Sequence, residues 1–177
     1  PPRSTLFPYT TLFRSIRRCL AASLEMILAR LSHKEPLEIR VQVDIGVQDI
    51  KGVGCQSEEF IPVEKTEEGN IYTQGLAALL MGLKHPFNKY YHIRLLINKD
   101  YLLKQLWFDP HPQSRTLPIP PGTKVDALSV FLHEILHALA FNGWLDSKTG
   151  VSKSINRARS VYDRYVTARE EIGRAHV

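Results

Sequence analysis

Two short stretches of the chain alternate between apolar and polar residues with the period of a β-strand. In residues 37–46 every second residue is apolar, and the residues between are charged or carry amides. In residues 92–98, Ile93, Leu95 and Ile97 alternate with Arg94 and Leu96. A period of two sends successive side chains to opposite faces of a sheet. The pattern therefore predicts two strands, each with one buried face.

Other segments repeat apolar residues at helical spacing. Residues 16–31 predict an amphipathic helix with a structural role, residues 76–83 a short apolar helix, and residues 158–170 a helix with Val161 and Tyr165 facing inward. Residues 52–70 mix glycines, acids and one proline, which indicates a short strand or loop. The proline-rich residues 109–122 predict a surface connection, because proline fixes φ and lacks a backbone donor.

The most apolar helical segment runs from about Lys124 to Phe141. Thr123, with Asp126 three residues later, predicts its N-terminal cap, and Asn142-Gly143 predicts its end. Apolar residues cover most of its circumference, as expected for a helix at the centre of a domain. The predicted inward-facing residues are Leu128, Phe131, Leu132, Ile135, Leu136 and Leu139.

This central helix carries the spacing His-Glu-x-x-His, as His133, Glu134 and His137. Residues four apart on a helix share a face, so the two imidazoles can bind one metal ion. The motif is typical of zinc-dependent peptidases, in which the glutamate accepts a proton from water at the zinc. The alternative is a buried helix with two histidines by accident, which would desolvate both imidazoles and a carboxylate without partners. The other histidines have no spacing relation to the motif and are predicted at the surface: His33, His85, His92 and His111.

Both ends of the chain match reading-frame translations of sequencing-library adapter oligonucleotides. Residues 1–15, PPRSTLFPYTTLFRS, match one adapter, and residues 171–177, EIGRAHV, match the opposite one. We therefore expect residues 16–170 to be the native part, one domain cut from a longer protein.

Composition is ordinary for a globular protein, with 44% hydrophobic residues. The net charge of +5 falls to +3 without Arg3 and Arg14, which lie in the adapter match. Basic residues near the C-terminus lack an aromatic stacking motif, so a solvated face is a better interpretation than a nucleic-acid surface. The sequence predicts neither a membrane span nor a nucleic-acid partner.

Cys19 and Cys55 fit either a disulfide or two buried thiols.

The segment VDALSVFLHEILHALAFNGW resembles the active-site helix and following turn of zincin metallopeptidases, in particular matrixin-like and leishmanolysin-like secreted peptidases. The resemblance is strongest over residues 123–144. LEIRVQVDIG and HIRLLIN resemble the upstream strand pair of such proteins, and SVYDRYV a segment that follows the motif.

This resemblance implies a zincin-like α+β fold, in which a small twisted sheet packs on an N-terminal helix and the central helix, with the C-terminal part missing. It implies a zinc ion (Zn2+) held by His133 and His137, with Glu134 as general base and acid. It further implies secretion, and a peptide or protein substrate lying along an edge strand near His92–Asn98.

The chain departs from the metzincin pattern at two positions, because Ala140 stands where glycine is expected and Gly143 where a third histidine is expected. The third zinc ligand is therefore open. It lies beyond residue 170, or it is one of three acidic residues: Asp146, Asp163 or Glu170. One possible function is that of a zinc endopeptidase. The alternative is a noncatalytic zincin-fold module that binds proteins, or an inactive fragment. Retention of Glu134, which a structural metal site does not need, favours the enzyme.

Overall fold

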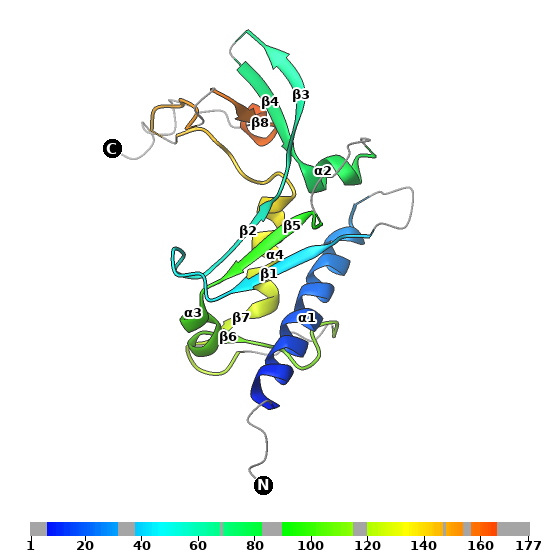
Figure 1. Cartoon of the computed structure of the whole chain (residues 1–177), viewed down its shortest axis with the longest axis vertical. Coiled ribbons are helices and arrows are strands. Elements are labelled where there is room, and N and C mark those ends of the chain that lie inside the picture. The colour runs from blue at the N-terminus through cyan, green and yellow to red at the C-terminus, as the bar shows by residue number, and fades with distance from the viewer. Residues whose placement is uncertain are drawn as a thin grey trace, which may run out of the picture.

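The computed structural model describes residues 7–31, 38–67, 69–82, 90–114, 120–146, 148–153 and 157–165. Helices and small sheets are mixed along the chain (Figure 1), so the predicted α+β class is confirmed. Within these ranges no helix combines the length and apolar character that crossing a membrane requires.

The central sheet contains β1 (Val41–Ile45), β5 (Ile93–Ile97) and β2 (Val53–Ser57) in the order β1-β5-β2. The two strands predicted by alternation are confirmed as β1 and β5, which pair in parallel. The prediction that His92–Asn98 forms an edge strand is wrong, because β2 pairs antiparallel with the other side of β5. The edge beside the central helix is therefore β2.

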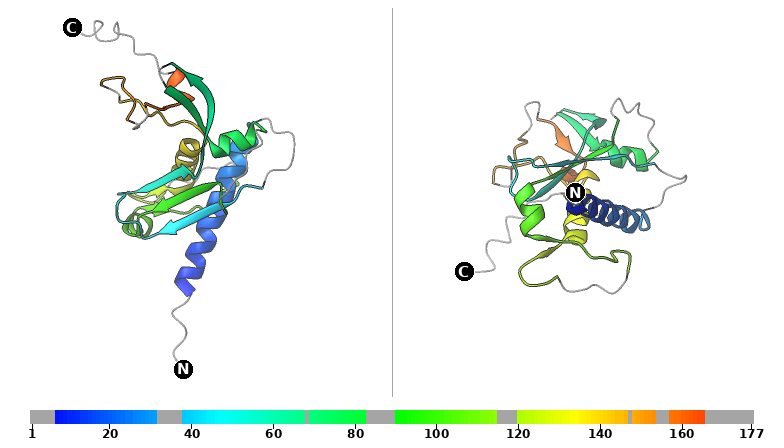
Figure 2. Two further views of the ribbon diagram at one scale, coloured as in Figure 1. Left: turned by 45° about the horizontal axis from the view of Figure 1, so that its top comes forward. Right: turned by 60° about the horizontal axis from the view of Figure 1, so that its bottom comes forward.

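Two helices cover one face of this sheet (Figure 2): α1 (Phe7–Leu28) and α4 (Ala127–Ala138). They contribute to one apolar core with β5, whose alternating residues Ile93, Leu95 and Ile97 are fully buried. Helix α1 begins inside the segment that matches the adapter translation. The buried apolar residues among its described side chains lie from Ile16 onward, and Leu12 is partly buried against the same core.

A hairpin of β3 (Phe60–Thr66) and β4 (Gly69–Gln74) projects from the end of the central sheet (Figure 1), and β8 (Arg159–Ser160) pairs in parallel with β4. The sequence predicted only a short strand or loop in residues 52–70. The difference arises because β3 faces solvent with most of its side chains and has no apolar alternation.

The remaining elements are short. Helix α2 (Gly75–Leu80) confirms the helix predicted near residues 76–83, and α3 (Lys99–Lys104) starts where the Asn98 side chain accepts a hydrogen bond from the Tyr101 N–H. Strands β6 (Leu106–Trp107) and β7 (Val125–Asp126) pair in parallel.

The helix predicted over residues 158–170 is wrong in its described part. β8 occupies its start, and only a 3-10 turn follows at Tyr162–Tyr165, where Tyr165 is exposed instead of buried. Local hydrogen bonds explain the difference, because the Asp163 carboxylate accepts the N–H and hydroxyl of Ser160 and closes a tight turn. Residues 166–170 lie outside the described residues.

Two cysteines and one histidine are buried in the fold. Cys19 and Cys55 are both buried and free, which confirms the interpretation as two thiols. His92 is buried, contrary to the prediction of a surface residue, because it precedes a strand at the centre of the sheet. Its Nδ1 accepts a hydrogen bond from the Arg40 N–H, and burial lowers its pKa.

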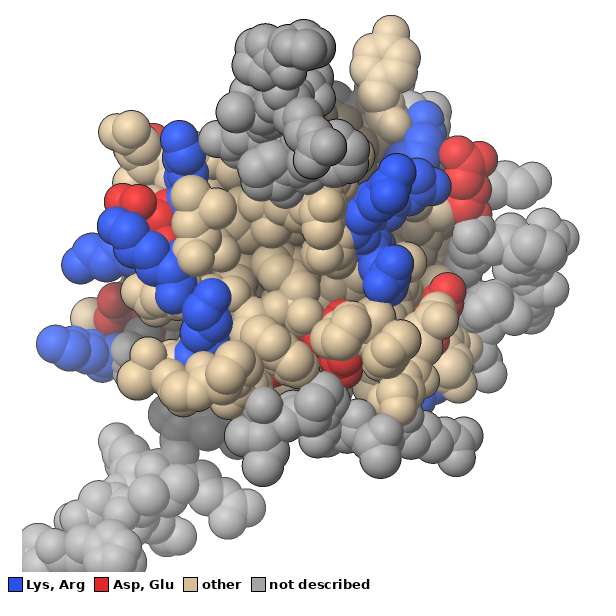
Figure 3. All heavy atoms as spheres, turned by 90° about the horizontal axis from the view of Figure 1, so that it is seen from below, with Lys and Arg blue, Asp and Glu red and all other residues tan. Residues whose placement is uncertain are grey.

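Seen from below, the described surface carries Lys and Arg side chains in separate groups around a largely uncharged area (Figure 3). The basic residues thus do not form one continuous stripe on this face.

Candidate metal centre

Helix α4, which carries the His-Glu-x-x-His motif, is capped at its N-terminus by Asp126. The Asp126 carboxylate accepts hydrogen bonds from the backbone N–H groups of Leu128 and Ser129, at 3.3 and 2.9 Å. The predicted cap at Thr123 is wrong, because Val125 and Asp126 are held extended by pairing with β6. Leu136, predicted to face inward, is 36% exposed.

The helix ends at Ala138, before the predicted stop at Asn142-Gly143. Ala140 follows with φ of +114°, in the region that favours glycine. The metzincin pattern expects glycine at this position, and here Ala140 has the positive φ that glycine adopts most easily.

Replacing Ala140 with glycine should raise the free energy of unfolding by about 1 kcal/mol, because it relieves the positive φ of a residue with a Cβ. Urea denaturation would measure the change. As a matched control, Ala21→Gly in the exposed part of α1 should lower the free energy of unfolding by about 1 kcal/mol. Equal destabilisation by both variants would show that Ala140 is not strained.

His133 and His137 bring their imidazoles together on one side of α4. Their Nε2 atoms lie 3.1 Å apart, and the ring planes are inclined by 86°. Two nitrogen ligands of a tetrahedral zinc ion, each about 2.0–2.1 Å from the metal, lie about 3.3 Å from each other. The pair therefore has the nitrogen spacing that a shared zinc ion needs.

A backbone carbonyl defines which nitrogen of His137 is free. Nδ1 lies 2.7 Å from the carbonyl oxygen of Phe141, which can only accept, so Nδ1 donates its proton. In the neutral ring Nε2 then carries a lone pair, directed towards His133. Histidine ligands of metals commonly donate their second ring nitrogen to such a carbonyl, which fixes the orientation of the ring.

Glu134 lies beside the edge strand β2. The carboxylate is half-buried and accepts a hydrogen bond from the backbone N–H of Cys55. Burial raises the pKa of Glu134, and the neighbouring His137 and His133 partly oppose this effect. A carboxylate with a raised pKa, next to a pair of histidines, suits proton transfer near neutral pH.

Among the described residues, no three His, Cys, Asp or Glu side chains come together to hold a metal. Asp146 lies in a turn, where its carboxylate accepts hydrogen bonds from the N–H groups of Lys148 and Thr149. These bonds lower the pKa of Asp146. Glu170 lies outside the described residues.

Asp163 is buried and anchors the segment that follows α4. Its two carboxylate oxygens accept hydrogen bonds from the N–H of Trp144 at 3.0 Å, and one also accepts from the N–H of Ser160 at 2.8 Å. A Cβ at Gly143 would lie 2.8 Å from Asp163 Oδ1. Position 143, where the metzincin pattern has its third histidine, therefore has no room for a side chain in this structure.

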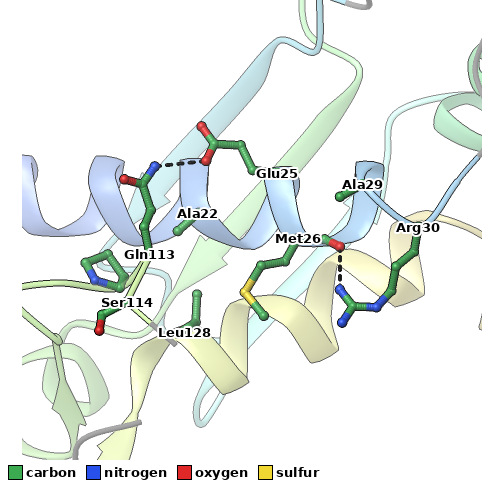
Figure 4. Close-up of a pocket in the computed structure, with 9 residues that line it drawn as sticks. Ala22, Glu25, Met26, Ala29, Arg30, Gln113, Ser114 and Leu128 are labelled. Atoms are coloured by element: carbon green, nitrogen blue, oxygen red, sulfur yellow. Dashed lines mark hydrogen bonds between the residues drawn. The ribbon is translucent and has the colours of Figure 1, made fainter. Parts of the chain in front are cut away.

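Two cavities differ in their relation to the histidines. One, of about 500 Å3, lies between α4 and the start of β2 and is lined by His133 and Glu134. A larger one, of about 700 Å3, lies between α1 and residues 112–114 (Figure 4), where Gln113 donates a hydrogen bond to Glu25. The larger cavity has no histidine in its lining, so the smaller one is the candidate substrate site.

Sequence reasoning missed the backbone partners of the site, namely the Cys55 N–H and the Phe141 carbonyl. Any residue supplies such groups, so no side-chain signal in the sequence could have identified them.

Comparison of the chain with models of protein families, with curated protein sequences and with solved structures found no significant match. The assignment of function therefore depends on the residues of the site.

Proposed function

We propose that this chain is the zincin-like catalytic part of a secreted zinc-dependent endopeptidase. The observation that carries the proposal is the histidine pair, with Nε2 atoms 3.1 Å apart and the His137 ring oriented by the Phe141 carbonyl. His133 and His137 would hold the zinc ion, and a third ligand would come from outside the described residues. When bound, zinc would act as a Lewis acid that polarises the scissile carbonyl and acidifies water.

The outward backbone groups of β2 would bind the peptide. Hydrogen bonds from the Asn98 N–H to the Gly52 carbonyl and from the Glu58 N–H to the His92 carbonyl fix the register with β5. In an antiparallel pair, the residues between hydrogen-bonded pairs direct their N–H and C=O groups away from the neighbour. These residues are Val53, Cys55 and Ser57. The Cys55 N–H is taken by Glu134, so the other outward N–H and C=O groups would bind an extended peptide that adds as a strand.

Glu134 would carry the proton in this reaction. It takes a proton from the attacking water as the oxygen bonds to the carbonyl carbon, and it delivers the proton to the leaving nitrogen as the C–N bond breaks. The N–H of Cys55 holds the carboxylate beside the edge where the peptide lies.

The alternative is a noncatalytic module that binds proteins along the same edge. The half-buried position and raised pKa of Glu134 favour the enzyme, because strand addition alone needs no carboxylate there.

Zinc titration of the full chain, with His137→Ala as control, tests the metal site. We expect about one zinc per chain in the wild type and at least tenfold weaker binding in the variant, because each ligand contributes strongly to affinity. Zinc-dependent cleavage of a denatured protein substrate then tests the reaction. Zinc binding that is unchanged by His137→Ala would contradict the assignment of the ligands.

A further inference from the structure

The cavity beside the histidine pair has an asymmetric distribution of charge. Lys51 is the only lysine or arginine among its described lining residues, and Glu134 is the only acidic residue. His133 and Ser129 lie in the same lining, and the rest consists of Gly52, Val53, Val130 and Tyr101. Side chains that enter from a peptide on β2 would therefore meet a largely apolar surface with one lysine.

Lys51 and Glu134 are separated along the direction of β2. The Glu134 carboxylate accepts the N–H of Cys55, four residues after Lys51. Lys51 lies in the bend that precedes β2. Extended chain rises about 3.3 Å per residue, so the two steps from Cys55 back to Val53 already span about 7 Å, and Lys51 comes before them. A ligand carboxylate next to Lys51 is thus displaced from the negative charge of Glu134.

Lys51 has no partner among the described residues. It is exposed and forms no hydrogen bond or ion pair there, whereas Lys104 and Lys153 pair with Asp100 and Asp146. Its ammonium group can therefore bind a ligand without breaking an interaction with the described part of the chain.

We propose that this cavity selects peptides with an acidic side chain within about three residues of the scissile bond, and that Lys51 binds its carboxylate. The inference rests on the proposed function, since the peptide is placed on the edge of β2. An extended peptide there passes from Glu134 towards Lys51, and its side chains on the α4 side enter the cavity.

Matched peptide pools that carry Glu, Gln or Lys at one position test this selection in two ways. Cleavage by the zinc-loaded full chain is compared between pools, and binding of the same peptides is measured by fluorescence anisotropy with the metal removed by chelator. We expect Glu to be preferred over Gln by about three- to fivefold, the size of an exposed ion pair, and the preference to weaken at high salt. Lys51→Glu should reverse it, with Lys preferred over Glu.

Lys65→Glu is the matched control, because Lys65 is an exposed lysine on the distant hairpin strand β3. It makes the same change in net charge and should leave the preference unchanged. If acidic peptides bind preferentially and Lys51→Glu reverses this preference, the role of Lys51 is supported even when no peptide is cleaved. In that case only the hydrolytic function fails. Cleavage without acidic preference, or a preference that Lys65→Glu changes as much as Lys51→Glu does, overturns the proposed role of Lys51 but not the hydrolytic function. If the peptides are neither bound nor cleaved, both proposals are overturned.

Discussion

Replacing Glu134 with glutamine should lower the rate of peptide cleavage by about 10²- to 10⁴-fold while zinc stays bound. Glutamine has nearly the same size and can still accept the hydrogen bond from the Cys55 N–H, but it cannot take a proton from water. Cleavage kinetics and zinc content, measured on the same preparation, separate the two effects.

Glu67→Gln is a suitable control, because Glu67 lies exposed in the turn between β3 and β4 and the substitution changes charge in the same way. It should leave cleavage unchanged. If the Glu134→Gln variant cleaves peptides at the wild-type rate, Glu134 is not the proton carrier. If the variant loses its zinc, Glu134 contributes to metal binding instead.

Replacing Asp163 with alanine should lower the free energy of unfolding of the metal-free chain by about 3 kcal/mol. The change removes a buried acceptor and leaves the N–H groups of Trp144 and Ser160 without their partner. Trp144 packs against Phe60, with ring centroids 5.2 Å apart, so the loss should also loosen the segment after α4 from the hairpin. Urea denaturation in the presence of chelator measures the effect.

The same variant separates a structural role from a zinc ligand. A ligand would leave the metal-free stability nearly unchanged and abolish zinc binding, whereas an anchor lowers stability in the absence of metal. Asp146→Ala is the control, since its carboxylate lies in an exposed turn and should matter less for stability. A metal-free stability equal to that of the wild type would contradict the anchoring role of Asp163.

Alternation and helical spacing predicted the main elements because those elements have one face in the core. Strands β1 and β5 and helices α1 and α4 each present a continuous apolar face, and burial of that face is the largest favourable term in folding. The hairpin of β3 and β4 lacks such a face, and β8 (Arg159–Ser160) forms a strand through pairing with β4. In these segments distant partners override the local pattern.

The sequence alone determined the motif of His133, Glu134 and His137, since a spacing of four on one helix brings the two histidines together in any fold that keeps the helix. Only the tertiary structure decided that β2 is the edge strand beside Glu134, that the Phe141 carbonyl orients His137, and that Asp163 occupies the space at Gly143. Helical periodicity is a local property of the chain. Strand order, loop carbonyls and buried anchors depend on contacts between residues far apart in sequence, which no local spacing encodes.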